Sequence, residues 1–268
     1  MNMDQNIWLN PEGYQRTSRF LQWKYLKILL ERSNIEGNVL DVGCGTGNAY
    51  DFLKSTSGIN YTGIDISVNM IEFSRNRFPE VSDRFIAFDF LDNELVLGDD
   101  YDHVICAACL HWFHPHQNRV IRRIWNSLKP GGRLHLSTAL DFSFLHGEEA
   151  IQQKTIEHVR SVFTPQSGLD TFHSRRLSVE AIKHIVSDFD VQKVSLHEEV
   201  LEFFSYEDFR DWHTGSGSVV AKQFAPEDRK AAEELYYRTL HSRYVEGEFK
   251  VAYGTALLTL TKSDDICN

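Results

Sequence analysis

The sequence predicts a doubly wound α/β fold with a parallel central sheet, and three observations support this fold class. Short apolar runs typical of buried strands alternate with stretches of helical periodicity over residues 35–140. The first run leads directly into a glycine-rich stretch, residues 43–47, called the glycine loop below. Three successive runs end near an acid, at Asp41, Asp65 and Asp89. This combination is typical of sheets that bind a ligand at their carboxyl edge.

Length and composition indicate one α/β domain with an appended cap, or two small domains. The 268 residues are 42% hydrophobic and 25% charged, which is ordinary for a globular chain that folds without disulfides or metals. The formal charge of −10 argues against nucleic acid or an anionic membrane as the main partner. A polar start and the lack of a long apolar run predict no signal peptide, no membrane span and a cytoplasmic location.

The four cysteines are Cys44, Cys106, Cys109 and Cys267. They are too few and too scattered for a disulfide framework. Cys106 and Cys109 have the spacing of a redox or zinc pair, but they lie in an apolar run and no second pair accompanies them. We therefore expect buried, reduced thiols and no metal site.

The N-terminal region is expected to form a helical lid over residues 1–34. Residues 1–16 show no regular pattern and are expected to be irregular. Apolar residues then recur at helical spacing over residues 20–30, with Thr17 or Ser18 as the cap.

The region expected to bind a cofactor covers residues 35–140. Its expected strands cover residues 39–42, 61–66, 84–89, 101–109 and 133–138. Its expected helices cover residues 48–55, 67–78 and 115–128. Ser67 is expected to cap the second helix, and Pro115 suits the first turn of the third.

The pattern loosens after residue 140. We expect helices over residues 148–163, 178–189, 205–214 and 226–244, and strands over 191–200 and 250–261. Residues 141–248 are assigned to a strand with cap insertions and 249–262 to the last strand. No linker divides the chain, so residues 1–268 are expected to fold as a single domain.

The spacing within the glycine loop separates several classes of nucleotide site. Gly43, Gly45 and Gly47 alternate, whereas nicotinamide dehydrogenases use Gly-x-Gly-x-x-Gly and phosphate-cradling loops end in Gly-Lys-Ser/Thr. Asp65 is placed to accept both hydroxyls of a ribose. The alternative is that acids at strand ends only cap the following helices, which is a weaker explanation for three acids than for one.

Four segments in order resemble the signature of the class I S-adenosylmethionine-dependent methyltransferases. They are residues 39–47 (VLDVGCGTG), 63–67 (GIDIS), 89–90 (DF) and 128–132 (LKPGG). The resemblance implies a seven-stranded sheet of order 3-2-1-4-5-7-6 with the last strand antiparallel. It also implies S-adenosyl-L-methionine as the cofactor and S-adenosyl-L-homocysteine as its product.

The resemblance also implies a role for each cofactor residue. Gly43, Gly45 and Gly47 would approach the methionine portion, and Asp65 would bind the ribose. Ile66, Asp89 and the backbone of Phe90 would contact the adenine, while Asp41 and the backbone near Cys106 would hold the amino group. Carboxylates suit a sulfonium amino acid, whereas a pyrophosphate needs positive donors.

The substrate side is indicated by residues 109–113 (CLHWF). This segment is similar to juvenile hormone acid methyltransferases, and the related malonyl-carrier-protein and trans-aconitate enzymes have a Leu-Gln-Trp variant there. These families esterify carboxylic acids, and the resemblance implies that Trp112 and Gln22 hold the substrate carboxylate. Residues 8–14 also resemble the start of trans-aconitate methyltransferases. Trp112 could instead be a packing residue, and Gln22 a solvated one.

His111, His114 and His116 follow the fourth expected strand. No carboxylate is adjacent, so we expect no metal, and His111 is a candidate base or hydrogen-bond donor. The predicted function is methyl transfer from S-adenosylmethionine to a small molecule, with O-methylation of a carboxylate leading. O-, N- or C-methylation of another scaffold remains open, as does a non-catalytic binding protein. A monomer or weak homodimer is expected.

Overall fold

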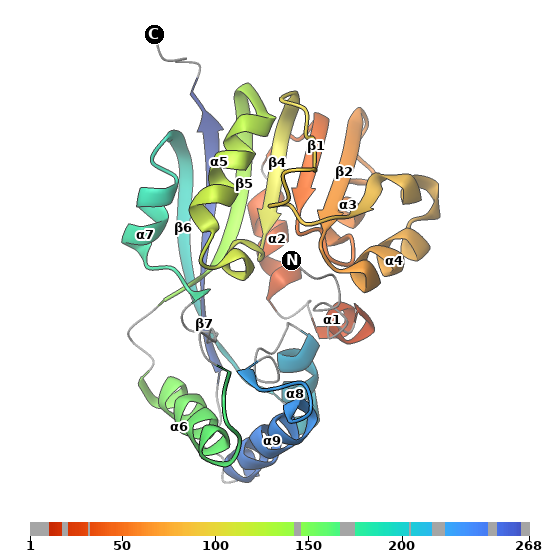
Figure 1. Ribbon diagram of the computed structural model, residues 1–268. Helices are drawn as coiled ribbons and strands as arrows, with labels where there is room; N and C mark the ends of the chain where they lie inside the picture. The colour runs from red at the N-terminus through yellow and green to blue at the C-terminus, as the bar shows by residue number, and fades with distance from the viewer. Residues whose placement is uncertain are drawn as a thin grey trace.

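The computed structural model describes residues 11–17, 21–31, 33–141, 146–166, 175–203, 205–215, 223–245 and 251–263. Within them lies a seven-stranded sheet of order β3-β2-β1-β4-β5-β7-β6 (Figure 1). The first five strands pair in parallel, and β7 runs antiparallel to both β5 and β6. The predicted fold class, strand order and antiparallel last strand are therefore confirmed.

The strands are β1 (Gly37–Val42), β2 (Ile59–Asp65), β3 (Phe85–Ala87), β4 (Tyr101–Ala107), β5 (Leu128–Leu140), β6 (Phe189–Leu201) and β7 (Val251–Lys262). β3 is shorter than expected because the Asp89 carboxylate accepts from Leu91 N at 2.9 Å and turns the chain. β4 ends before Ala108, whose φ of 52° leaves the extended region. β5 starts at Leu128, five residues before the expected start of this strand at residue 133.

The α-helices are α1 (Pro11–Thr17), α2 (Gln22–Leu30), α3 (Asn48–Leu53), α4 (Val68–Arg77), α5 (Gln117–Ser127), α6 (His146–Val162), α7 (Val179–Ile185), α8 (Tyr206–Gly215) and α9 (Arg229–Val245). The short 3₁₀ helices η3 (Pro79–Arg84) and η4 (Leu110–Phe113) complete the set used below. Ser67 caps α4 as predicted, because its hydroxyl accepts from Met70 N at 3.4 Å.

Three expectations about helices were wrong. Residues 11–17 form helix α1, although irregular chain was expected there; Pro11 at its start and Glu12 in its first turn both favour a helix. Pro115 lies ahead of α5, which begins at Gln117. α7 ends at Ile185, because Phe189 already belongs to β6.

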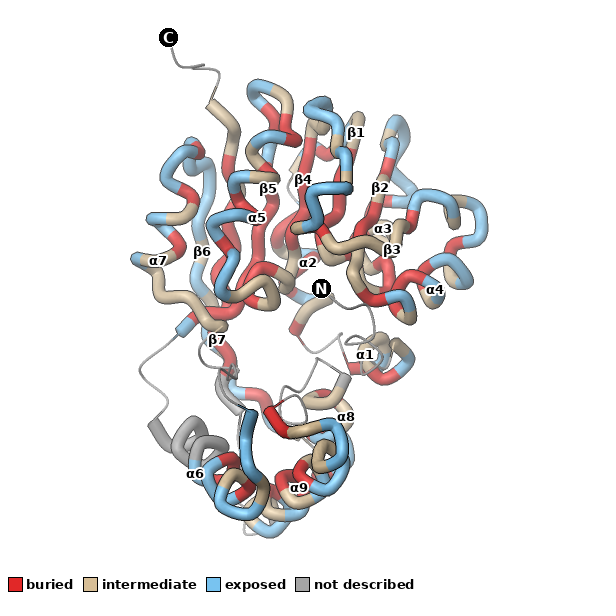
Figure 2. Tube along the Cα trace, in the orientation of Figure 1, coloured by how far each residue is buried: buried red, intermediate tan, exposed pale blue. Residues whose placement is uncertain are grey.

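The sheet packs between two apolar layers because alternate residues of each strand face opposite sides. Val39 and Ile105 belong to the core shared with α2 and α3. Leu40 and Val104 belong to the core shared with α5 and α7. Figure 2 shows the central strands largely buried and the outer faces of the helices exposed. Side chains at the strands' carboxyl ends are therefore held from both faces.

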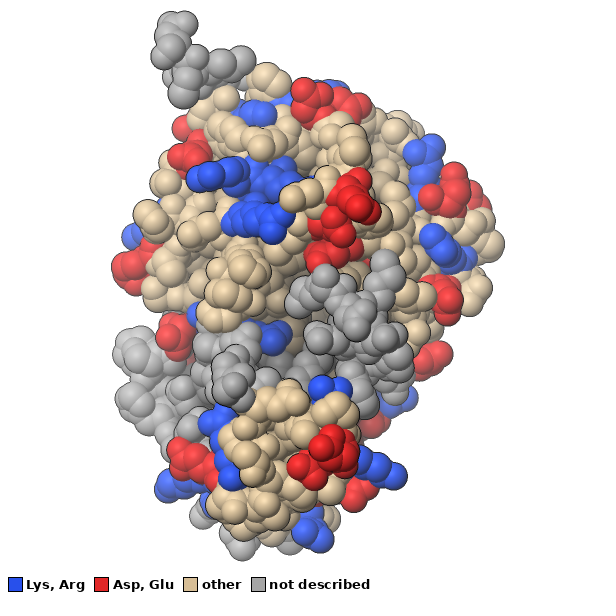
Figure 3. Space-filling view, in the orientation of Figure 1, with Lys and Arg blue, Asp and Glu red and all other residues tan. Residues whose placement is uncertain are grey.

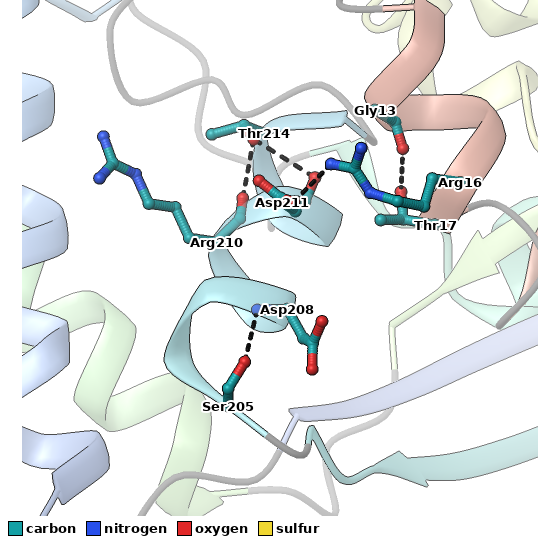
Figure 4. Close-up of polar contacts among 8 residues, drawn as sticks. All are labelled: Gly13, Arg16, Thr17, Ser205, Asp208, Arg210, Asp211 and Thr214. Atoms are coloured by element: carbon teal, nitrogen blue, oxygen red, sulfur yellow. Dashed lines mark hydrogen bonds and ion pairs between the residues drawn. The ribbon is translucent and has the colours of Figure 1, made fainter.

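Helices α6, α8 and α9 gather beyond the carboxyl ends of the parallel strands (Figure 1). α1 lies beside α8, where Arg16 forms an ion pair with Asp211 (Figure 4). Ser205 caps α8 by accepting from Asp208 N at 3.1 Å (Figure 4). Among the described helices, none combines the length and the apolar character that crossing a bilayer requires.

Charges of both signs are interspersed on the face seen in Figure 3, with a group of basic side chains over α5. Two of the α5 arginines stabilise the fold through hydrogen bonds to the backbone. Arg119 donates to Leu91 O at 2.6 Å, and Arg123 donates to Asp92 O at 2.8 Å. These bonds tie α5 to the loop that follows β3.

Candidate functional site

The glycine loop forms a close-packed turn between β1 and α3. Gly43, Gly45 and Gly47 have φ values of 72°, 53° and 77°, in the left-handed region that favours glycine. A methyl group on Gly43 would lie 2.0 Å from Cys109 Sγ, and one on Gly47 would lie 2.8 Å from the Phe78 ring. At Gly45 the nearest atom would be a Tyr14 ring carbon at 3.9 Å. The space in front of Gly45 is thus open enough for a ligand to approach the backbone.

Side chains from α4 hold the glycine loop in place. Ser74 Oγ donates to Gly45 O at 2.7 Å. Arg77 donates to Thr46 O at 3.1 Å and to Asp51 Oδ2 at 2.5 Å. The loop is therefore fixed by hydrogen bonds from the helix that follows β2.

Asp65 ends β2 beside the glycine loop. One carboxylate oxygen accepts from Gly45 N at 2.9 Å and the other accepts from Ser67 N at 2.8 Å. Burial raises the pKa of this carboxyl, while the two backbone bonds lower it. Each oxygen retains a lone pair, so the carboxylate can still accept two further hydroxyls. Ile66 follows directly and is half-buried.

Asp41 lies inside β1 and is 3% exposed. Its Oδ2 accepts from the Tyr61 hydroxyl at 2.7 Å. Burial raises the pKa of Asp41 to about 7, and the nearby Asp65 also raises it, while the Tyr61 bond lowers it. A cation placed against Asp41 would favour its ionised form.

The loop after β3 presents Asp89 and Phe90. Asp89 is half-buried and its Oδ1 accepts from Leu91 N. Phe90 is buried, with its ring 6.2 Å from the Phe113 ring and 5.5 Å from the Arg123 guanidinium. The backbone at Phe90 is thus held by ring packing on α5 and η4.

The end of β4 brings a thiol pair to the glycine loop. Cys106 is fully buried in β4, and Cys109 lies two residues beyond the strand. A hydrogen bond with Cys106, together with burial, raises the pKa of the Cys109 thiol. Ala108 N donates to Ser137 Oγ at 2.8 Å, which fixes the turn. Both cysteines are free thiols.

His111 and Trp112 lie in η4. His111 is 3% exposed, and burial with the charges of Arg175 and Arg176 lowers its pKa to about 3. Trp112 is half-buried, with its ring 5.3 Å from the His111 ring and 4.9 Å from the Arg175 guanidinium. The structure brings these residues beside two arginines that the sequence did not single out.

Tyr14, like the two arginines, had no predicted role in the site. It lies on α1, and burial raises the pKa of its phenol. The Tyr14 ring is also the nearest group to a methyl placed on Gly45, at 3.9 Å, so the phenol lies beside the glycine loop. Next to it, Gln15 Oε1 accepts from Thr46 Oγ1 at 2.7 Å. α1 therefore lies over the glycine loop. In the sequence, the resemblance of residues 8–14 to trans-aconitate methyltransferases was the only indication that Tyr14 belongs to the site.

A small cavity opens under α2, next to the ends of β4 and β5. This α2 cavity is lined by Leu21, Gln22, Tyr25, Ala108, Ser137, Thr138, Ala139, Tyr253 and Thr255. Its empty volume of about 280 Å³ includes open solvent, and the part that a water molecule can occupy is about 10 Å³. Of the two residues predicted to hold the substrate, Gln22 lines this cavity and Trp112 does not.

Four polar side-chain atoms on the wall of the α2 cavity are buried without a hydrogen-bond partner. They are Gln22 Oε1, Tyr25 Oη, Thr138 Oγ1 and Thr255 Oγ1. A buried polar atom left unpaired costs about 1–3 kcal/mol, and native structures keep few of them. Four such atoms around one cavity would be completed by a polar group that enters it. Among the described residues, no group of three or more His, Cys, Asp or Glu side chains could hold a metal ion.

Residues 40–134 match the family model described as a methyltransferase domain. These residues form a methyltransferase domain. The match confirms the predicted resemblance to S-adenosylmethionine-dependent methyltransferases.

Two relatives that are similar in sequence are also named as methyltransferases. The chain is 34% identical over 140 residues to a malonyl-[acyl-carrier protein] O-methyltransferase of Acetivibrio thermocellus, covering 51% of this chain and 48% of that protein. It is 31% identical over 134 residues to a ubiquinone biosynthesis O-methyltransferase of Coxiella burnetii, covering 49% and 56%. The chain thus spans about half the length of these curated relatives.

The fold extends further than the sequence similarity. The YcgJ protein of Bacillus subtilis superposes with a TM-score of 0.61 at 16% identity, covering 90% of this chain and 99% of that protein. The likeness therefore reaches beyond residues 40–134 and includes elements of the cap.

Proposed function

We propose that the chain transfers the methyl group of S-adenosylmethionine to a small molecule, with a carboxylate oxygen as the leading acceptor. One observation carries the proposal: the Asp65–glycine loop arrangement and the α2 cavity lie at the carboxyl ends of neighbouring strands. β1, whose end leads into the glycine loop, pairs with β4, and β4 ends beside Ala108 in the cavity wall. A donor at one end would thus face an acceptor at the other.

The residues of the cofactor end fit a sulfonium nucleoside. This end comprises Asp41, the glycine loop, Asp65 and the loop at residues 89–90. Asp65 would accept both ribose hydroxyls, and Ile66 and the Phe90 backbone would contact the adenine. Asp41 and the backbone near Cys106 would hold the amino group, and Gly43, Gly45 and Gly47 the methionine portion. When bound, the cofactor supplies an activated methyl group.

The acceptor end comprises the α2 cavity with Gln22, together with Trp112 and His111. It is proposed to work by aligning the acceptor with the methyl group and not by removing a proton. Gln22 would orient the acceptor in the α2 cavity, and Trp112 would close its side. His111, with its pKa lowered to about 3, is a weak base at neutral pH. An acceptor that is already ionised, such as a carboxylate, needs no base, which favours it over phenols, amines and carbon acids.

The chain organisation is part of the proposal. Residues 1–34 would act as a lid, 35–140 as the cofactor region, and 141–248 as a strand with the cap, closed by the last strand at 249–262. The contact of Gln15 with Thr46 supports the lid assignment.

Calorimetry with S-adenosylhomocysteine, followed by incubation with S-adenosylmethionine and a panel of acids, phenols and amines, tests the proposal. We expect saturable binding of S-adenosylhomocysteine and a methyl ester as the main product, detected by mass spectrometry. Binding without any methylated product would favour a non-catalytic binding protein. Binding of NAD with no affinity for S-adenosylhomocysteine would overturn the proposal.

A further inference from the structure

Two adjacent arginines enter the acceptor end from the chain that precedes α7. Leu177 forms a parallel bridge with Leu140 at the end of β5. Leu177 N donates to Ala139 O at 3.3 Å, and Asp141 N donates to Leu177 O at 3.0 Å. Ala139 itself lines the α2 cavity. This pairing fixes the segment immediately after Arg175 and Arg176 at the cavity's edge.

Both guanidinium groups rest on aromatic rings of the acceptor end. The Arg175 guanidinium carbon lies 4.9 Å from the centre of the Trp112 ring. The Arg176 guanidinium carbon lies 5.7 Å from the centre of the Tyr253 ring, which lines the cavity. Stacking on a ring orients a guanidinium through its face, whereas its N–H donors lie in its plane. The two rings therefore hold the arginines in defined orientations.

Both arginines influence the pKa of one buried side chain, that of His111. Burial, followed by the charges of Arg175 and then Arg176, lowers the pKa of His111. The Trp112 ring on which Arg175 stacks lies 5.3 Å from the His111 ring, so the Arg175 guanidinium lies in the same cluster as His111. Two basic side chains thus lie at the acceptor end, whereas the cofactor end carries Asp41 and Asp65.

We propose that Arg175 and Arg176 form an anion subsite at the edge of the α2 cavity, and that the acceptor carries a carboxylate or phosphate that binds there. The planar donor fork of arginine matches both groups in a bidentate manner. Neither arginine is among the residues that line the α2 cavity, so the acceptor would bear this anionic group in addition to the atom that is methylated. Dicarboxylates and phosphorylated acids meet that requirement. The inference rests on the proposed function, which identifies the α2 cavity as the acceptor site.

The test uses malonate and inorganic phosphate as probes, titrated by calorimetry into the protein saturated with S-adenosylhomocysteine. The variants are Arg175→Gln, Arg176→Gln, the double variant and Arg176→Lys. Arg122→Gln, an exposed arginine of α5, is the matched control. We expect saturable binding of at least one anion, about tenfold weaker or more in the double variant. Arg176→Lys should be intermediate, because lysine keeps the charge and loses the fork. Binding of malonate or phosphate alone identifies which anion the subsite takes.

Saturable binding of neither anion would overturn the inference, as would equal binding by the wild type and the double variant. Thermal unfolding and S-adenosylhomocysteine affinity of each variant show that the fold and the cofactor end are intact. If S-adenosylhomocysteine does not bind the wild type, the proposed function fails. The anion titration on the ligand-free protein then tests the subsite alone.

Discussion

The cofactor end and the acceptor end are made from different kinds of atom. At the cofactor end, backbone groups of the glycine loop and two strand-end carboxylates face the crevice, and Ser74 and Arg77 brace the loop. At the acceptor end, side chains from α2, β5 and β7 surround the α2 cavity, and four of their polar atoms are unpaired. A site whose polar atoms are satisfied before binding is preorganised for one ligand. A site with unpaired polar atoms depends on its ligand for completion.

The largest effect is expected for Gly43→Ala, which tests how closely the cofactor end is packed. The new methyl group would lie 2.0 Å from Cys109 Sγ at a φ of +72°. Backbone strain of about 1–2 kcal/mol and overpacking of about 1–3 kcal/mol together predict a loss of about 3 kcal/mol in the free energy of unfolding. Denaturant titration measures this loss.

Gly58→Ala is the matched control for Gly43→Ala. Gly58 has a similar φ of +77°, but nothing lies within 4 Å of the added methyl group. Only the strain of about 1–2 kcal/mol should remain. Equal losses at the two positions would mean that the cofactor end is no more closely packed than a surface turn.

Asp65→Ala is expected to have the next largest effect. It removes the proposed ribose acceptor and also leaves Gly45 N and Ser67 N without their partner. A loss of about 2 kcal/mol corresponds to about 30-fold weaker S-adenosylhomocysteine binding, measured by calorimetry. Asp65→Asn keeps one acceptor oxygen, so its S-adenosylhomocysteine affinity should lie between those of the wild type and Asp65→Ala. An unchanged affinity in the alanine variant would exclude the ribose assignment.

The raised pKa of Asp41 predicts a pH dependence confined to the cofactor end. With its pKa at about 7, the carboxylate is ionised above that pH and protonated below it. A cationic ligand prefers the ionised form, so S-adenosylmethionine affinity should be full above pH 7 and fall at most about tenfold per unit below it. Calorimetry between acidic and mildly alkaline pH measures the profile.

Two variants check that Asp41 causes this dependence. Asp41→Asn should flatten the profile. Tyr61→Phe removes the hydrogen bond that lowers the Asp41 pKa, so the fall should begin at a higher pH. A profile that is the same in all three proteins would assign the dependence to another group.

The smallest effect in binding energy is expected at the acceptor end, where function and stability should move in opposite directions. Gln22→Leu replaces a buried amide whose oxygen has no partner by an apolar group of similar size. The free energy of unfolding should rise by about 1 kcal/mol, while turnover should fall about tenfold with S-adenosylhomocysteine affinity unchanged. Thr255→Val should behave similarly. A loss of stability in both variants would show that these atoms are paired within the fold.

The sequence was sufficient to predict the features that depend on neighbouring residues. The alternation of strands and helices, the glycine loop and the Ser67 cap follow from local spacing, whereas the strand order came from the resemblance to class I methyltransferases. Acids at the ends of parallel strands meet because the strands run in one direction. Asp41 and Asp65 could therefore be placed together before the structure was known.

The acceptor end could not be predicted in the same way because its residues are brought together by long-range packing. Gln22, Ala139 and Tyr253 are far apart in the chain but line one cavity. Arg175 and Arg176 have no motif, and only the bridge of Leu177 to Leu140 places them. α1 was missed because a helix of seven residues is too short to show a clear apolar period.

The position of β7 bears on how the molecule forms during synthesis. β7 lies between β5 and β6 and contributes Tyr253 and Thr255 to the α2 cavity. The proposed cofactor-binding residues are complete in sequence by residue 106, and the parallel strands by residue 140. A ribosome-bound chain therefore holds all donor-binding residues long before the cavity wall is made. N-terminal regions generally fold first during translation, so cofactor present at that stage could stabilise a half-built sheet until its final central strand arrives.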